Sequence, residues 1–294
     1  MLSQQASVDL IQGAADKRVS EFARAFMVTV ARMRDRVTDD MVAVDLGPGE
    51  PSETLAVFDG WEVTKKATQT RDPVRFYAEI LSEVGVGTVA GMSGRLEAAL
   101  QVQSPFVHQA AEQLTAKLIT NVTEETRQAV REVIRQAWMD GLPPKEAAPL
   151  VRETIGLSKR QAKQLQAYSR NLQGEPDERK LTSQFARRLH QQRALVIART
   201  ETLTAANRGQ QLAWQEMRAK GVLPSGFRQV WITTPDDRLC DTCAPMSGQT
   251  VALNQQFVSS ERGVLPSERV AYVGGVTESP PLHPQCRCCL GAAF

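Results

Sequence analysis

The sequence has little of what metal binding, redox chemistry and catalysis most often use. Its 294 positions hold five cysteines, three histidines and 5% aromatic residues. No apolar run reaches the length of a membrane-spanning helix, and Asp9 and Asp16 interrupt the basic-then-apolar pattern of a secretion signal. We therefore expect a protein that is made and folded in a cytosol and has no membrane partner.

Signatures of the common enzyme classes are missing as well. The sequence has no His-Glu-x-x-His, no phosphate-binding Gly-x-x-x-x-Gly-Lys-Ser/Thr and no Gly-x-Ser-x-Gly. A zinc deaminase would need His-x-Glu ahead of its cysteine pair, and neither His108 nor His190 is followed by Glu at that spacing. We expect both histidines to be surface or packing residues, and we expect no enzymatic activity.

What the sequence does have is an ordinary globular composition with an uneven charge. With 42% hydrophobic and 23% charged residues, it can bury the core of one large domain or two small ones. The net charge of +2 hides a basic middle, because residues 121–220 carry 18 Lys/Arg against 11 Asp/Glu. This region could face phosphates or an acidic partner. Its charges alternate in sign along much of the chain, so it could equally be a solvated helix surface.

Apolar residues in the first third recur at helical spacing. Residues 14–36 predict a helix with one buried face. That face consists of Phe22, Phe26, Val30 and Met33. Gly and Pro after residue 45 predict that this first helix ends near Val44. Residues 72–117 are mostly helical in pattern, but 84–94 are too rich in glycine for a comfortable helix interior.

The helical signals sharpen from Thr123, which is placed to cap a helix that ends before Gly141. The apolar stripe predicted for that helix consists of Val130, Val133, Ile134, Ala137 and Trp138. A short helix is expected over 145–154. The Ser-x-x-Gln capping box at 158–161 opens another helix, which reaches about residue 172.

A polar, proline-containing linker at 173–180 precedes the longest predicted helix, over 182–220. Within this helix the segment "ARTETLTAANRG" (198–209) gathers polar side chains beside apolar ones. The four nearest one another on the helix are Arg199, Glu201, Thr204 and Asn207. They could form a buried hydrogen-bonded network between helices, or they could face solvent.

The sequence pattern changes after Pro224 from helical spacing to short segments typical of strands and loops. β-Branched and aromatic residues predict strands at 227–234 and 248–253, separated by a turn at 235–237. Residues 254–282 are mostly loop, with a further candidate strand at 269–273. The predicted fold class is mainly α: an elongated helical body followed by a small, loop-rich C-terminal module with β-strands and a zinc knuckle. The predicted division is 1–120, 121–223 and 224–294.

All five cysteines lie in this C-terminal module. "LCDTC" and "HPQCRC" form two short clusters about forty residues apart, and each suits two ligands of a single ion. A four-coordinate structural zinc site made by Cys240, Cys243, His283 and Cys286 is our first prediction. Cys288 is the substitute for His283 or Cys286, and Cys289 is a bystander. Buried free thiols and disulfides are the alternatives.

Three segments together carry a resemblance to a known family. "VIARTETLTAANRGQQLAW", "VWITTPDDRLCDTCAPMSGQTV" and "PPLHPQCRC", in that order and spacing, resemble the phage minor head proteins, also called Mu F-like head morphogenesis proteins. The resemblance covers about residues 120–294. Some relatives carry a toxin or nuclease domain beyond the cysteine motif, and because this sequence ends at Phe294 we expect none here.

The resemblance implies a minor capsid protein of the virion, present in few copies and associated with the portal inside the head. It would act in procapsid assembly, DNA packaging or DNA delivery. Its partners would be the portal protein, capsid or scaffold proteins, and packaged DNA. The family's metal-type motif falls on Cys240, Cys243, His283, Cys286 and Cys288, and its Arg-Thr-Glu-Thr motif falls on residues 199–202. A zinc-dependent nucleic-acid-binding protein is the alternative function.

Overall fold

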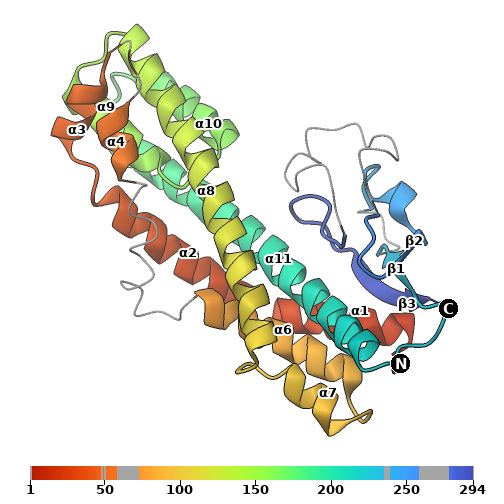
Figure 1. Ribbon diagram of the computed structural model, residues 1–294. Helices are drawn as coiled ribbons and strands as arrows, with labels where there is room; N and C mark the ends of the chain where they lie inside the picture. The colour runs from red at the N-terminus through yellow and green to blue at the C-terminus, as the bar shows by residue number, and fades with distance from the viewer. Residues whose placement is uncertain are drawn as a thin grey trace. The chain divides into compact units, whose positions relative to one another are not determined.

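The computed structural model describes residues 2–47, 49, 51–57, 73–234, 239–257 and 278–293. Most of these residues are helical, and a small sheet lies near the C-terminus (Figure 1), so the prediction of a mainly α fold with a small C-terminal β module is confirmed. The helices are α1 (Gln4–Asp16), α2 (Val19–Arg34), α3 (Asp39–Asp45), α4 (Ser52–Ala56), α6 (Pro73–Val89), α7 (Gly94–Ala99), α8 (Pro105–Met139), α9 (Pro144–Thr154), α10 (Lys159–Asn171) and α11 (Glu178–Ala219). None of the described helices is long and apolar enough to cross a membrane.

The chain forms two compact units, each built from segments distant in sequence. Unit 1 comprises Met1–Ser20, Pro73–Thr115 and Val196–Phe294, and unit 2 comprises Glu21–Asp72 and Ala116–Leu195. Helices α8 and α11 each contribute residues to both units. The three-part division predicted from the sequence follows the order of the chain and stays a prediction.

The sheet belongs to unit 1. It consists of β1 (Arg228–Ile232), β2 (Thr250–Ala252) and β3 (Cys289–Ala293), and β1 is the central strand, antiparallel to both neighbours. The strands predicted at 227–234 and 248–253 are therefore confirmed. The predicted turn at 235–237 and strand at 269–273 lie outside the described residues. Because β3 immediately follows Cys288, pairing of β3 with β1 fixes the chain beside the cysteine cluster.

Two glycines allow α6 and α11 to pack closely within unit 1. A Cβ atom at Gly209 would lie 2.6 Å from the carbonyl oxygen of Leu81, and one at Gly85 would lie 3.3 Å from the carbonyl oxygen of Gly209. Residues 84–94 were expected to be too rich in glycine for a comfortable helix interior, but their first half is helical, since α6 continues to Val89. Close packing between helices offsets the low helix propensity of glycine at these positions.

Unit 2 has an apolar core between several helices. The face predicted for the first helix is confirmed, because Phe22, Phe26, Val30 and Met33 are all buried on α2. The largest described core cluster of this unit includes Met33, Val37, Val42, Leu55, Val57, Ala129, Val130, Val133, Ile134, Ala137, Ala147, Ala148, Val151, Ile155 and Ala162. These residues come from α2, α3, α4, α8, α9 and α10 and the turns between them, so no one helix of the unit supplies the core alone.

Two helix boundaries differ from prediction. The helix predicted over 14–36 and expected to end near Val44 is not continuous. Helix α1 ends at Asp16, α2 runs from Val19 to Arg34, and Thr38 caps the separate helix α3 by accepting a hydrogen bond from the backbone N–H of Met41. Thr123 is not a cap, because α8 runs unbroken from Pro105 to Met139. No glycine or proline interrupts α8 after its first residue, and a threonine can occupy a helix interior when the surrounding packing favours it.

The remaining helical predictions hold, with one exception. Helix α9 matches the segment expected at 145–154, α10 begins with the predicted capping box of Ser158 and Gln161, and α11 is the longest helix. The exception is Trp138, which is 45% exposed and is not part of the buried stripe. The helix ends one residue later, so Trp138 lies at its exposed tip.

Candidate metal centre

The first cluster forms a tight turn after β1. The carbonyl oxygen of Cys240 accepts hydrogen bonds from the backbone N–H groups of Cys243, at 3.0 Å, and Ala244, at 2.9 Å. A short 3-10 helix, η2 (Ala244–Met246), follows directly. This closed turn brings the two side chains of the Cys-x-x-Cys motif onto one side, as a pair of ligands to one ion requires.

The second cluster forms a similar turn just before β3. The backbone N–H of Cys286 donates to the carbonyl oxygen of His283 at 3.1 Å, and the N–H of Cys288 donates to the sulfur of Cys286 at 3.4 Å. Gln285 lies inside this turn with φ of +63°. That left-handed conformation is uncommon for a residue other than glycine. It closes the turn and brings both ligand side chains onto one side.

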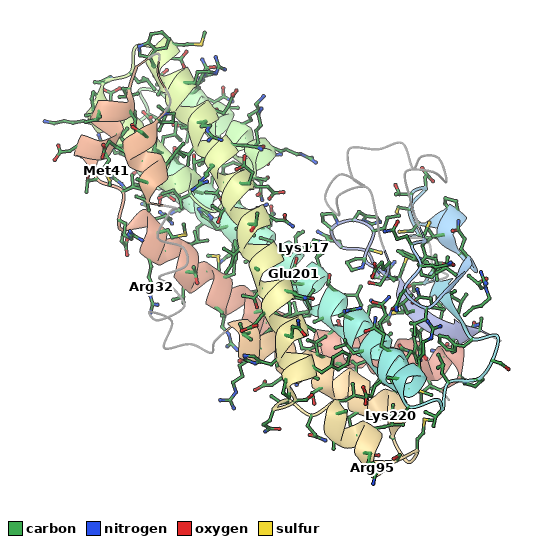
Figure 2. The ribbon with its side chains drawn as sticks, in the orientation of Figure 1. Arg32, Met41, Arg95, Lys117, Glu201 and Lys220 are labelled. Atoms are coloured by element: carbon green, nitrogen blue, oxygen red, sulfur yellow. The ribbon has the colours of Figure 1, made fainter. Side chains whose placement is uncertain are left out.

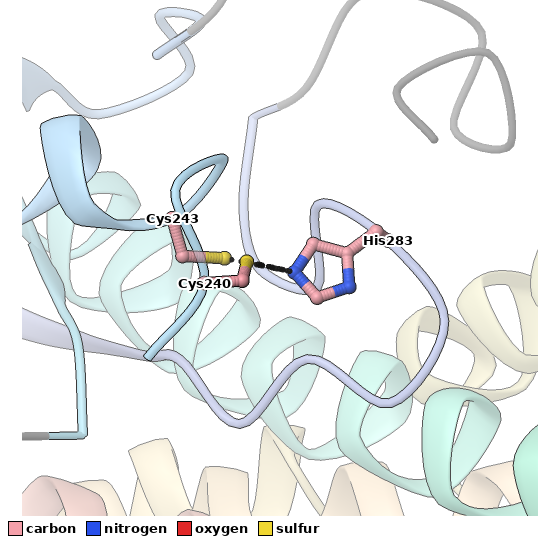
Figure 3. Close-up of side chains that lie close together, drawn as sticks. All are labelled: Cys240, Cys243 and His283. Atoms are coloured by element: carbon pink, nitrogen blue, oxygen red, sulfur yellow. Dashed lines mark hydrogen bonds between the residues drawn. The ribbon is translucent and has the colours of Figure 1, made fainter. Parts of the chain in front are cut away.

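The two turns face one another, and their ligand atoms converge (Figure 3). Nε2 of His283 lies 3.0 Å from the sulfur of Cys240 and 3.1 Å from that of Cys243. The sulfurs of Cys243 and Cys286 are 3.7 Å apart. Around tetrahedral zinc, two sulfurs are separated by about 3.8 Å, and a sulfur and a nitrogen by about 3.6 Å, given the usual bond lengths. The donor set and its spacing therefore fit a zinc ion, with slight expansion on the histidine side.

The ligand atoms form two overlapping groups, each within 4.8 Å. One group is Cys240, Cys243 and His283, and the other is Cys243, Cys286 and Cys288. Cys243 belongs to both groups. The structure thus brings all five predicted ligands together. Which four of them bind the ion stays a prediction.

The ring of His283 is oriented for ligation. Its Nδ1 lies 2.8 Å from the carbonyl oxygen of Pro284, so an N–H at Nδ1 donates to that oxygen. This leaves the lone pair of Nε2 directed at the sulfurs of Cys240 and Cys243. A backbone carbonyl that fixes one ring nitrogen while the other binds metal is the usual arrangement in protein metal sites.

The electrostatics of the thiols favour a cation. All five cysteines are free, so the disulfide alternative is not what the structure adopts. Hydrogen bonds from Cys243 and Cys288 lower the pKa of Cys286, whereas the contact with Cys286 raises the pKa of Cys243. The neighbouring thiols thus stabilise a thiolate at Cys286. Binding of a divalent ion would release the protons that remain on the other sulfurs.

A small cavity of about 30 Å³ lies between the two turns. Its lining includes all five predicted ligands and also Thr234, Leu239, Gln285 and Arg287. A volume near that of one water molecule suits a single ion. The thiols and the imidazole that line this cavity are the donors that a structural zinc ion uses.

Cys289 lies outside both ligand groups. It is the first residue of β3, and burial raises the pKa of its thiol, so it stays protonated. Alternation along the strand explains this placement, because successive side chains point to opposite faces of a sheet.

Helix α11 supplies buried polar side chains beside the site, so the predicted buried network at residues 198–209 is confirmed only for Glu201 and Asn207. Thr204 is half-buried and bonds within its own helix. Glu201, labelled in Figure 2, accepts a hydrogen bond from the hydroxyl of Tyr77 at 2.7 Å. Thr200, Thr202 and Asn207 are also buried, whereas Arg199 is exposed. Thr200 and Asn207 contact the chain between Gln285 and Leu290, which carries Cys286 and Cys288 and is called the ligand segment below. The sequence did not predict these contacts. The separation of Thr200 and Asn207 by seven residues, two helical turns, was the signal that could have indicated a shared face.

The other two histidines do not form a second site in the described residues. His108 is exposed beside Glu112 on α8. His190 in unit 2 is buried, with Nε2 3.0 Å from the carbonyl oxygen of Glu153, and burial lowers its pKa to about 4. His190 is therefore neutral at pH 7 and packs inside the helical unit, while His108 is a surface residue, as the sequence predicted.

Comparison with known proteins places these features in a family. The family described as "Phage Mu protein F like protein" matches residues 128–291, more than half of the chain. The match spans the polar segment of α11 and both ligand turns. The chain belongs to this Mu F-like family, and membership indicates a structural, virion-associated phage head morphogenesis protein. No curated protein and no solved structure matches the chain.

Proposed function

We propose that this protein is a minor structural component of a phage head that acts beside the portal during procapsid assembly, DNA packaging or DNA delivery. The family match over residues 128–291 carries the proposal. The chemistry of the site agrees with a structural role, because thiols and one imidazole around a small cavity are a donor set for one structural ion. The partners we propose are the portal protein and capsid or scaffold proteins.

The proposal includes a structural zinc ion held by four of the five ligands. A closed four-ligand zinc site stabilises a fold without catalysing a reaction. Here the ion would join the turn after β1 to the turn before β3, across about forty residues of sequence between Cys243 and His283. Fixing two distant points of a short module offsets the entropy cost of closing a long loop.

Protein quantification in purified phage particles tests the role in the head. The proposal predicts that the protein is present in procapsids and in mature particles, at a copy number near that of the portal and far below that of the major capsid protein. Particles formed without this gene product should show defective heads or lack DNA. Absence of the protein from both procapsids and mature particles would refute a structural role in the head.

A second candidate function is contact with packaged DNA. The chain has no Asp or Glu from Thr154 to Gly174 or from Arg179 to Thr200, so α10 and the first half of α11 after Glu178 carry only positive charge. Exposed cations in these stretches include Lys159, Arg160, Lys180, Arg187 and Arg188. Exposed cations without acids beside them in the sequence are typical of a surface that binds phosphates.

Salt dependence of binding tests this second function. Contact with several phosphates predicts retention of double-stranded DNA at low salt and steep loss as salt rises. Replacing both Arg187 and Arg188 with Gln should reduce the slope by about 0.9 for each phosphate that these side chains neutralise. Arg170→Gln is the matched control, because Arg170 already pairs with Asp140 at 2.6 Å. No retention at low salt would exclude DNA contact and leave the structural proposal standing.

A further inference from the structure

The two halves of the candidate metal centre are held within unit 1 in different ways. The Cys240–Cys243 turn is closed by its own backbone. In the part of the chain that the structure describes, the hydrogen bonds that join this turn to the second turn all involve ligand side chains. The second turn is also closed by its own backbone, but in addition its backbone bonds side chains of α11. The chain that follows the first turn is tied to β1 instead, through the backbone N–H of Gly248 and the carbonyl oxygen of Trp231. This asymmetry suggests different roles for the two halves.

Thr200 bonds the second turn ahead of Cys286. Its side chain is buried, and its hydroxyl donates to the carbonyl oxygen of Val196 at 2.8 Å while accepting from the backbone N–H of Gln285 at 3.2 Å. Gln285 is the residue in the left-handed conformation, between His283 and Cys286. Such a conformation costs energy outside glycine and persists only where the surroundings fix it. Thr200 supplies one such contact.

Asn207 bonds the ligand segment after Cys288. Its side chain is fully buried, and its Oδ1 accepts a hydrogen bond from the backbone N–H of Leu290 at 2.8 Å. Its Nδ2 donates to the carbonyl oxygen of Leu203 at 3.0 Å and lies 3.5 Å from that of Cys288. A buried side chain that bonds both sides of Cys289 fixes the path of the backbone as it leaves the site. Removing it would leave a buried N–H without a partner.

The two contacts are spaced to act together. Thr200 and Asn207 are seven residues apart on one helix, about 10 Å along its axis. They therefore fix the ligand segment both before Cys286 and after Cys288. Figure 3 shows the loop that carries His283 passing beside the helix, opposite Cys240 and Cys243.

We propose that Thr200 and Asn207 are positioning residues that hold the His283–Cys288 half of the metal centre in its binding geometry before an ion is present. The ion then captures the Cys240–Cys243 turn. This inference rests on the proposed metal centre and assigns a physical role to two polar residues in the 198–209 segment. Neither residue belongs to the two groups of ligand atoms. Their effect is to lower the entropy cost of ordering the ligands, as the outer contacts of a metal site commonly do.

Cobalt titration of the full-length protein tests the inference, because charge transfer from thiolate to Co²⁺ reports both affinity and the number of bound sulfurs. Thr200→Val removes the hydroxyl with little change in shape. We expect its apparent Co²⁺ affinity to fall at least tenfold, within the range seen for outer-contact substitutions in metal sites. Thr200→Ser keeps the hydroxyl and should restore the affinity to within about threefold of wild type, a difference of about 0.7 kcal/mol.

Thr202→Val is the matched control. Thr202 is buried two residues away, and its hydroxyl donates only within α11, to the carbonyl oxygens of Ala198 at 2.8 Å and Arg199 at 3.3 Å. Both valine variants remove a hydroxyl from the same helix, so a general decrease in stability affects them alike. Only Thr200→Val should weaken cobalt binding. Asn207→Leu is the second test, and we expect the rate of metal transfer to a chelator to rise at least tenfold.

The outcomes separate the two proposals. Wild-type protein without a thiolate-to-cobalt band would overturn the metal centre itself. A wild-type band together with equal affinities for the Thr200→Val and Thr202→Val variants would overturn the positioning role and leave the metal centre intact. A wild-type band with a lower Co²⁺ affinity in Thr200→Val alone, restored in Thr200→Ser, would support both.

Discussion

Tyr77 on α6 donates a hydrogen bond of 2.7 Å to the carboxylate of Glu201 on α11, and both side chains are buried. A buried carboxylate is costly unless it is bonded, so this contact ties α6 to the helix that supports the ligand segment. Glu201 is the acidic member of the Arg-Thr-Glu-Thr motif. Its buried position assigns Glu201 to the support of the fold in unit 1.

Replacing Tyr77 with Phe should therefore destabilise the protein. We expect the free energy of unfolding to fall by about 1.5–3 kcal/mol, because the deleted hydroxyl bonds a charged partner. Urea unfolding followed by circular dichroism measures the change. Tyr168→Phe is the control, since Tyr168 contributes a stacked ring contact with Phe185 that phenylalanine retains. Equal effects of the two substitutions would contradict the role assigned to the Tyr77–Glu201 contact.

The close packing of α6 on α11 predicts opposite effects for alanine at two helical glycines. Gly209→Ala should destabilise by about 1–3 kcal/mol, because its Cβ would lie 2.6 Å from the carbonyl oxygen of Leu81 and the backbone must shift. Gly13 on α1 has open space around it. Gly13→Ala should stabilise by about 0.5–1 kcal/mol through helix propensity. Thermal unfolding of both variants would show the two signs, and a neutral Gly209→Ala would contradict the close contact.

Burial of His190 predicts a pH dependence of stability. Its folded pKa of about 4 lies below the ordinary value of 6.5, so the unfolded chain binds more protons between these values. The contribution of the neutral ring is fully present above pH 6.5 and is lost as pH falls toward 4, by at most about 3 kcal/mol. The charged groups facing the ring, Arg34 on α2 and Arg193 on α11, disfavour its protonation further.

Unfolding free energies measured from pH 7 to pH 4.5, for wild type and His190→Gln, test this dependence. Subtracting the two curves removes the contributions of the other titrating groups. We expect the difference to shrink steadily below pH 6.5 as the wild type loses its advantage. A difference that stays constant over this range would mean that the burial of His190 does not affect its proton affinity.

Substitution of single cysteines should affect the metal centre unequally. Cys243 belongs to both groups of ligand atoms, so Cys243→Ser should weaken metal binding most. Cys289→Ala should leave metal content unchanged, because Cys289 belongs to neither group. Metal content of the purified variants, measured by elemental analysis, gives the comparison. Loss of metal from Cys289→Ala with retention in Cys243→Ser would reverse the assignment.

Removal of the proposed zinc ion should destabilise unit 1 more than unit 2, since both ligand turns lie in unit 1. With free zinc at a thousand times its dissociation constant, the linked stabilisation is about 4 kcal/mol. Hydrogen exchange with and without a chelator measures it region by region. We expect protection to fall in β1 and β3 and to stay unchanged in α9 and α10. Uniform loss of protection over both units would contradict a local clamp.

Much of the fold was predictable from local patterns. The capping box at Ser158 and the glycine after α8 mark helix ends through chemistry that acts within a few residues, and they were predicted correctly. The interior position of Thr123 was not predictable, because tertiary packing overrides a favourable capping residue. Gly85 led to a wrong expectation for the same reason, because it lies inside α6 although glycine is unfavourable in a helix interior. Its close contact with α11 depends on a partner more than a hundred residues away.

In the candidate site, too, local features were predictable from the sequence and contacts between distant residues were not. The short spacings within each cluster predicted the ligand turns, because two side chains three residues apart can share one ion. The convergence of Cys243 with Cys286 depends on the pairing of β1 with β3, and the supporting contacts of Thr200 and Asn207 depend on how the chain folds back on α11. Such contacts link residues far apart in the sequence, and local spacing gives no information about them.

The measurement that tests the central claim most directly is native mass spectrometry of the purified protein, compared with its denatured mass under conditions that preserve disulfides. The account predicts a native mass heavier by one zinc ion and a denatured mass with all five thiols reduced. It also predicts that the extra mass disappears in Cys243→Ser and persists in Cys289→Ala. A metal-free native mass, with a denatured mass lighter by the hydrogens of paired thiols, would contradict the metal centre and the role of α11 in holding it.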